Sequence, residues 1–155
     1  MGTIEAVCIS EKKGVVKREV PEVLLEENWG ITNDAHAGTW HRQVSLLAGE
    51  SIDVVKKTLP QLKHGVFAEN IICRGLELTA LAIGDRLALG DTVLLEVTQI
   101  GKECHNAGCA IKKATGDCIM PREGIFARVL RGGAVRPGDP ITRQETKTQA
   151  QENGK

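Results

Sequence analysis

One short segment of the chain collects most of its reactive side chains: Cys104, His105, Cys109 and Cys118. Lys102 and His105 are near neighbours of Cys104, and glycines flank it on both sides. Positive neighbours and partial exposure lower a thiol pKa from about 8.5 and so raise the fraction of thiolate. Thiolate attacks sulfur and ligates metals, which makes Cys104 and His105 the predicted catalytic pair, with Cys109 and Cys118 as auxiliary thiols.

Two other interpretations of this segment stay open. Small cysteine side chains also fill gaps in loops without doing chemistry. A structural zinc site usually pairs its ligands as C-x₂₋₄-C twice, whereas here Cys118 follows the Cys104/Cys109 pair alone. No C-x-x-C motif occurs, so a thioredoxin-like redox site is disfavoured.

A second group of polar residues lies on a glycine-containing stretch and consists of Asp34, His36, His41 and Arg42. An arginine can form a fork onto a phosphate, and a histidine can exchange a proton near neutral pH. The stretch therefore suits an anion or a heterocycle, or is only a solvated loop with an Asx turn at Asp34. Further along, Arg122 and Arg128 are either additional phosphate ligands or partners in surface ion pairs.

The elements that must position these residues are mostly strands. Alternating or β-branched stretches bounded by turn residues predict strands over 2–10, 15–25, 44–47, 65–72, 81–88, 92–100, 125–130 and 135–143. The last two are expected to close the fold as a pair around Gly132. Ser51 is a candidate cap for a helix that carries Ile52, Val55 and Leu59 on one face and stops at Pro60, and 107–114 can form a short helix. Many short strands with few helices favour a barrel over a doubly wound sheet.

Composition places the chain among ordinary globular proteins. It has 155 residues, 41% of them hydrophobic, and a formal net charge of +0, so the basic stripe of a nucleic-acid binder is not expected. No signal peptide or membrane-spanning run is visible, which predicts a cytoplasmic protein whose five cysteines are thiols. We expect one domain over 1–143 and a polar, disordered tail over 144–155.

Several stretches together resemble the MOSC family, which is named for the C-terminal domain of molybdenum cofactor sulfurases. The similarity runs to about Ile141 and rests on 34–38 with 42–47, 65–71, 83–87 and 96–105, followed by 124–130. It implies a mainly β, MOSC-type barrel with a few short helices. It also implies one characteristic cysteine, here Cys104, that carries sulfur as a persulfide or ligates molybdenum.

The resemblance extends to ligands and partners. It implies that the chain binds molybdopterin or the molybdenum cofactor, with Asp34, His36, His41, Arg42, Lys102, Arg122 and Arg128 as cofactor-binding candidates. A cysteine desulfurase, which depends on pyridoxal phosphate, or a cofactor-assembly protein would be its partner. Two alternatives are a non-catalytic module that delivers the cofactor and a small molybdenum-dependent reductase of N-hydroxylated compounds.

Overall fold

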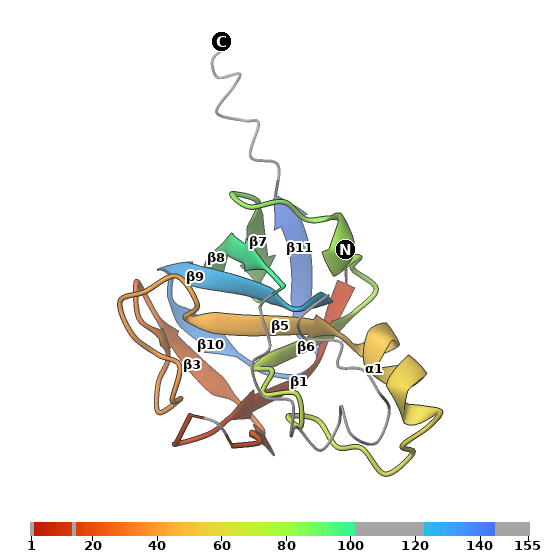
Figure 1. Cartoon of the computed structure of the whole chain (residues 1–155). Coiled ribbons are helices and arrows are strands. Elements are labelled where there is room, and N and C mark those ends of the chain that lie inside the picture. The colour runs from red at the N-terminus through yellow and green to blue at the C-terminus, as the bar shows by residue number, and fades with distance from the viewer. Residues whose placement is uncertain (1, 14, 102–122, 145–155) are drawn as a thin grey trace.

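Strands dominate the computed structural model, which describes residues 2–13, 15–101 and 123–144 (Figure 1). The strands are β1 (Gly2–Ile9), β2 (Arg18–Val20), β3 (Val23–Glu26), β4 (Gly30–Ile31), β5 (Val44–Ala48), β6 (Ile71–Arg74), β7 (Arg86–Leu89), β8 (Val93–Ile100), β9 (Ile125–Arg131), β10 (Gly133–Val135) and β11 (Pro140–Gln144). One α-helix, α1 (Gly49–Lys56), and one 3₁₀ turn, η1 (Leu78–Ala80), complete the described elements.

The main sheet closes on itself. Its strands follow the order β11-β7-β8-β9-β5-β6-β1-β2, and β1 also pairs with β11, so seven of the described strands form a closed barrel with β2 added beside β1. Most neighbours are antiparallel, whereas β5 and β6 are parallel and are joined through α1. A smaller sheet, β10-β3-β4, lies beside the barrel (Figure 1). The predicted mainly β barrel is therefore confirmed.

Strand alternation divides the buried side chains between two cores. On β5 and β6, Leu46 and Ile71 belong to the larger core, whereas their neighbours Leu47 and Ile72 belong to a smaller one. The smaller core also contains Ile52 of α1 and Phe67. Successive strand residues point to opposite faces, so α1 and the chain that follows it cover the outer face of the barrel wall at β5 and β6.

The predicted helix exists, but its start was placed wrongly. α1 begins at Gly49 after Ala48, and no side chain caps it. Ser51 lies inside the first turn, where its hydroxyl hydrogen bonds to the Glu123 carboxylate instead of to the helix amides. The helix ends at Lys56, before Leu59 and Pro60. No described helix is long and apolar enough to cross a membrane.

Several strand predictions need correction. The 15–25 stretch divides into β2 and β3, and 136–139 are not in a strand. Only Ile71 and Ile72 of the 65–72 stretch are in a strand, because Glu69 folds the preceding residues into turns by accepting hydrogen bonds from the Gly65 and Phe67 amides at 2.8 and 2.9 Å. Of the 81–88 stretch, only the end from Arg86 is extended. The two C-terminal stretches do not pair with each other: β9 pairs with β8 and β5, whereas β11 pairs with β7 and β1.

Candidate functional site

The loop between β4 and β5 carries Asp34 and His36, and Asp34 fixes it to the end of β1. One carboxylate oxygen of Asp34 accepts the Ser10 amide at 3.0 Å, and the other accepts the His36 amide at 3.0 Å. The latter bond is the Asx turn that the sequence allowed. The Ala35 amide donates to the Ser10 carbonyl at 2.7 Å. Both oxygens of Asp34 are thus engaged, and the acid positions the loop.

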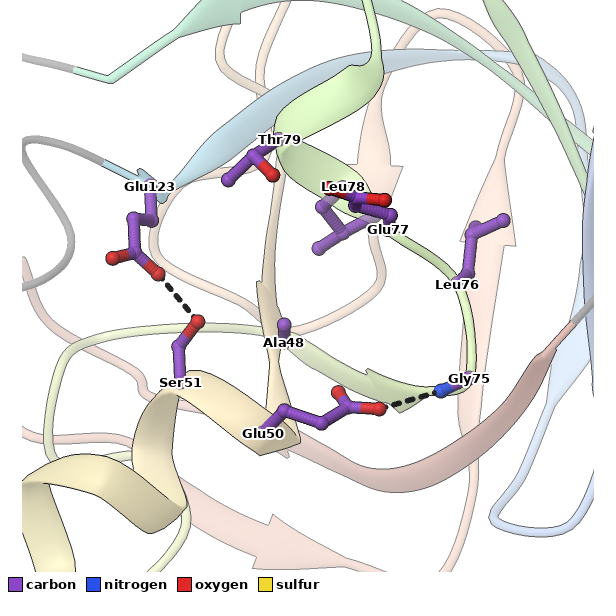
Figure 2. A pocket seen from close by; sticks show the side chains of 9 residues that line it. All are labelled: Ala48, Glu50, Ser51, Gly75, Leu76, Glu77, Leu78, Thr79 and Glu123. Atoms are coloured by element: carbon purple, nitrogen blue, oxygen red, sulfur yellow. Dashed lines mark hydrogen bonds between the residues drawn. The ribbon is translucent and has the colours of Figure 1, made fainter.

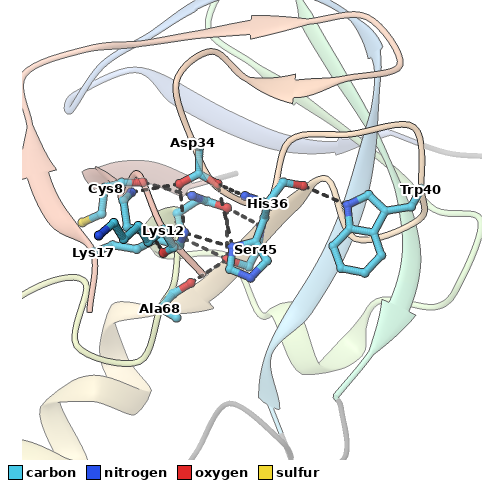
Figure 3. Close-up of polar contacts among 10 residues, drawn as sticks. Cys8, Lys12, Lys17, Asp34, His36, Trp40, Ser45 and Ala68 are labelled. Atoms are coloured by element: carbon cyan, nitrogen blue, oxygen red, sulfur yellow. Dashed lines mark hydrogen bonds and ion pairs between the residues drawn. The ribbon is translucent and has the colours of Figure 1, made fainter. Parts of the chain in front are cut away.

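Lys17, which no sequence pattern singled out, joins this loop from below (Figure 3). Its side chain and that of Asp34 are each 0% exposed, and Nζ lies 2.9 Å from Asp34 Oδ1. The same Nζ lies 3.1 Å from Ser10 Oγ and 3.0 Å from His36 Nδ1. A buried ammonium is costly unless a carboxylate pairs with it, and here the ion pair also reaches the imidazole.

Two positively charged side chains and the His36 imidazole lie around the Trp40 indole. Its indole donates to the His36 carbonyl at 2.8 Å, and its ring is stacked with the imidazole at 6.4 Å between centroids. The Arg42 guanidinium lies 4.9 Å from the Trp40 ring centre and 5.6 Å from that of Phe126, and Lys13 Nζ lies 5.1 Å from the indole. Cation–π contacts of this kind stabilise a cation without neutralising it.

Arg42 is also the one described residue with a buried, unsatisfied side-chain polar atom. Its Nε has no hydrogen-bond partner within the described ranges. A buried donor of this type costs about 1–3 kcal/mol when it stays unpaired, so an acceptor from outside the described residues is expected there.

The loop between β4 and β5 also contacts the end of β8, from which the chain continues toward β9. The register of the two strands shifts between Val97 and Gln99, and Thr98 at this bulge hydrogen bonds to the His41 carbonyl. His41 Nε2 lies 2.8 Å from Gln99 Oε1. The Gly101 amide donates to the Gly124 carbonyl at 2.7 Å, which holds the two ends of the connection together. Bulges often re-aim side chains beside functional sites.

A cavity of about 400 Å³ is lined by residues of α1, of the segment after β6 and by Glu123 (Figure 2). Glu50 and Glu77 line it together with Glu123. Glu50 accepts the Gly75 amide at 2.8 Å, and Ser51 hydrogen bonds to Glu123. An acidic lining of this kind does not suit the anionic cofactor that the sequence led us to expect.

Part of the predicted site lies outside the described residues: Lys102, Cys104, His105, Cys109, Cys118 and Arg122. Asp34, His36, His41 and Arg42 are brought together on one loop. Arg128 is paired with Glu96, at 2.7 Å between Nη2 and Oε1, on the exposed surface of β8 and β9. The described residues contain no group of three or more His, Cys, Asp or Glu side chains that could hold a metal.

Residues 33–142 match the MOSC domain. The chain belongs to the MOSC family. This family is associated with the molybdenum cofactor, so the chain's function is related to that cofactor. The sequence matches no curated protein.

Solved structures carry the same MOSC barrel. YuaD from Bacillus subtilis is 21% identical, with a TM-score of 0.75 over 90% of this chain and 93% of that protein. YiiM from Geobacillus stearothermophilus is 18% identical, with a TM-score of 0.68 over 97% of this chain and 78% of the other. YiiM from Escherichia coli is also 18% identical, with a TM-score of 0.67 over 93% and 69% of the two chains. At these identities the likeness establishes the fold.

The MOSC stretch 65–71 has a structural role in this chain. Asn70 is buried, accepts the Ser45 amide at 3.0 Å and donates to the Cys8 carbonyl at 3.0 Å, so it joins β5 to β1. Gly65 has a φ of +95°, and a Cβ there would lie 2.1 Å from the Lys17 carbonyl oxygen. Gly65 therefore allows the close packing that holds the backbone at Lys17.

The sequence patterns singled out Asp34, His36 and Arg42 of this candidate site but not Lys17, Lys13 or Trp40. Nothing local distinguishes Lys17 from the other cations of the chain, because its partner Asp34 is 17 residues away. Trp40 offered one signal: it is one of only two tryptophans and lies between the two histidines of the loop.

Proposed function

We propose that this domain handles sulfur for the molybdenum cofactor: it binds molybdopterin or the cofactor beside the His36–Arg42 loop, and Cys104 carries the sulfur. The observation that supports this most directly is the bonding of the loop to the end of β8. Cys104 follows Gly101 by three residues, which span at most about 11 Å. In the sequence, Cys104 thus comes directly after the strand end whose Gln99 lies 2.8 Å from His41.

The described side chains fit an anionic ligand. The buried Arg42 Nε has no partner in the part of the chain that the structure describes, Lys13 adds a second cation at Trp40, and Asp34 is neutralised by Lys17. A guanidinium with an unused N–H suits a phosphate oxygen, and the phosphate of the pterin is such a group. When bound, the cofactor supplies a molybdenum atom that accepts sulfur ligands. Arg42 would bind the anionic end, while His36 and Trp40 shape the loop.

The proposed sulfur step needs no external oxidant. The Cys104 thiolate attacks the terminal sulfur of a persulfide on a cysteine desulfurase; a new S–S bond forms on Cys104, and the desulfurase cysteine leaves as a thiolate. The product is a persulfide on Cys104, a modification that a reductant reverses. His105 and Lys102 would stabilise the attacking thiolate.

Sulfur loading of the purified protein tests the carrier role. Incubation with a cysteine desulfurase and cysteine should add about one sulfur atom per chain, which mass spectrometry detects and dithiothreitol removes. Cys104→Ser should abolish the addition with little change in melting temperature, and Cys118→Ser should reduce it in part. Burial raises the pKa of the Cys8 and Cys73 thiols to about 12, so these two serve as internal controls that should stay unmodified in peptide mapping.

Other outcomes favour the alternatives. Full sulfur addition to Cys104→Ser, or unfolding of that variant, would contradict the carrier role. Molybdenum retained by the wild type but not by Cys104→Ser, without any sulfur adduct, would support a cofactor ligand, as in a delivery module or a reductase of N-hydroxylated compounds. Arg42→Met should lower the pterin content of protein from a cofactor-producing strain, whereas Arg74→Met, at a surface ion pair, is the matched control that should not.

A further inference from the structure

Lys17 Nζ has three acceptors at hydrogen-bonding distance, one for each of its protons. They are Asp34 Oδ1 at 2.9 Å, His36 Nδ1 at 3.0 Å and Ser10 Oγ at 3.1 Å. The Ser10 hydroxyl donates its own proton to the Lys12 carbonyl at 3.1 Å, which leaves its oxygen as the acceptor toward Lys17. The whole cluster is consistent only with Lys17 as the donor in each bond.

The direction of the bond to His36 follows from the charges. A buried amine in contact with a carboxylate at 2.9 Å is held as an ammonium, which has three donors and no acceptor. His36 Nδ1 must then accept, so it carries no proton, and the proton of the neutral ring is on Nε2. Protonation of Nδ1 would place two N–H groups face to face at 3.0 Å.

We propose that Lys17 is a positioning residue of this site, which fixes His36 as the neutral Nε2–H tautomer and so makes it a hydrogen-bond donor toward an anionic ligand rather than a base. This deepens the proposed function, on which it rests for the nature of the ligand. The assignment of the proton itself depends only on the contacts of Lys17.

The charges around the ring agree with this assignment. The groups that face His36 in the described ranges are the Lys17 ammonium and the Asp34 carboxylate, whose Oδ2 is 3.9 Å from Nδ1. Lys13 and Arg42 lie over the indole with which His36 is stacked. Among the described residues, these three cations outnumber the one carboxylate, which is itself fully engaged, and they oppose a further positive charge on the ring. The same surplus of cations attracts an anion, such as a phosphate or a persulfide.

Nitrogen-15 NMR of the histidine rings in the wild-type, sulfur-free protein tests the proton assignment. At about pH 6, below the ordinary histidine pKa of about 6.5, an unperturbed ring is mostly protonated. His36 should instead show one unprotonated nitrogen, Nδ1, and one protonated nitrogen, Nε2. His64, which lies between Glu5 and Glu19, should show the imidazolium pattern in the same spectrum.

Variants then test whether Lys17 is the cause. Lys17→Met combined with Asp34→Asn removes both buried charges and with them the N–H donor that faces Nδ1, so a protonated Nδ1 should become detectable in the His36 ring. Lys12→Met, at an adjacent exposed lysine, should leave the His36 pattern unchanged. An imidazolium or an Nδ1–H ring in the wild type overturns the proposal, as does an unchanged His36 pattern in the double variant. Neither result depends on sulfur loading, so this proposal and the proposed function can fail separately.

Discussion

Two histidines of this molecule occupy opposite electrostatic surroundings. His36 accepts a hydrogen bond from the buried Lys17 ammonium, whereas His64 lies between two carboxylates, 2.7 Å from Glu5 and 3.0 Å from Glu19. Burial acts to lower the pKa of His64, but hydrogen bonds and the negative charges of Glu19 and Glu5 outweigh it, so that pKa is raised. The structure thus holds one ring as a neutral donor and favours the other as a cation.

The two surroundings differ in burial, which decides how much an ion pair contributes to stability. The side chains of Lys17 and Asp34 are 0% exposed, and their pairing fixes the loop and, as proposed, the proton of His36. His64 belongs to a partly exposed network in which Arg74, 41% exposed, binds Glu5 and Asp53. Exposed pairs of this kind contribute little to stability, whereas a buried pair is costly to break. The two regions meet where the Lys17 amide donates to the Gly65 carbonyl at 2.9 Å.

The largest expected effect comes from breaking the buried pair. Lys17→Met leaves the Asp34 carboxylate buried without a counter-charge, so the free energy of unfolding should fall by about 3–5 kcal/mol. Urea denaturation followed by circular dichroism measures it. Combining Lys17→Met with Asp34→Asn removes the uncompensated buried charge and should recover part of the lost stability. A loss below about 1 kcal/mol in Lys17→Met would show that the pair does not hold the loop.

The buried pair also marks the limit of the sequence analysis. β8 was predicted almost to the residue because its alternation of buried and exposed side chains is local. The Asp34–Arg42 stretch was singled out because four chemically active residues stand close together in the sequence. Lys17, by contrast, acquires its role from residues 17 and 19 positions away.

The 65–72 stretch was predicted wrongly for a different reason: its local pattern was clear, but a tertiary contact overrides it. Its composition predicts a strand, but Glu69 hydrogen bonds to the amides of Gly65 and Phe67 and imposes a turn with Ala68 at a φ of 65°. This tertiary arrangement overrides the local β propensity. Residue types alone do not reveal such a buried carboxylate.

The second prediction concerns pH and the His64 network. Because the folded pKa of His64 is raised, its contribution to stability is fully present below the unfolded value of 6.5 and is lost as the pH rises through the folded value. Burial acts to raise the pKa of Glu5, but hydrogen bonds from Arg74 and His64 outweigh it and lower that pKa. The contribution of Glu5 is therefore present above 4.5 and lost as the pH falls through the folded value. The network should stabilise most between about pH 4.5 and 6.5.

Unfolding free energies measured across this range provide the check. His64→Gln should remove the decrease in the free energy of unfolding above about pH 6.5. That decrease should be below about 1 kcal/mol because the network is partly exposed. Lys12→Met, at a surface lysine, should leave the wild-type profile intact. If the free energy of unfolding of His64→Gln still declines at alkaline pH as in the wild type, His64 is not the group that titrates. The proposed contrast between His64 and His36 would then not hold.

The smallest effect is expected at Arg74, and it sharpens the comparison because Arg74 makes more ion pairs than Lys17. Its Nε lies 2.7 Å from Glu5, and Nη1 lies 2.8 Å from Asp53. Water screens both contacts, so Arg74→Met should lower the free energy of unfolding by less than about 1 kcal/mol. At about 1 M salt the screening length falls to roughly 3 Å, and this small difference should shrink further, whereas the loss in Lys17→Met should persist because no solvent reaches that pair. Urea unfolding of both variants at low and high salt separates the two cases. A loss at Arg74 as large as that at Lys17, and equally insensitive to salt, would mean that burial is not what distinguishes the two histidine environments.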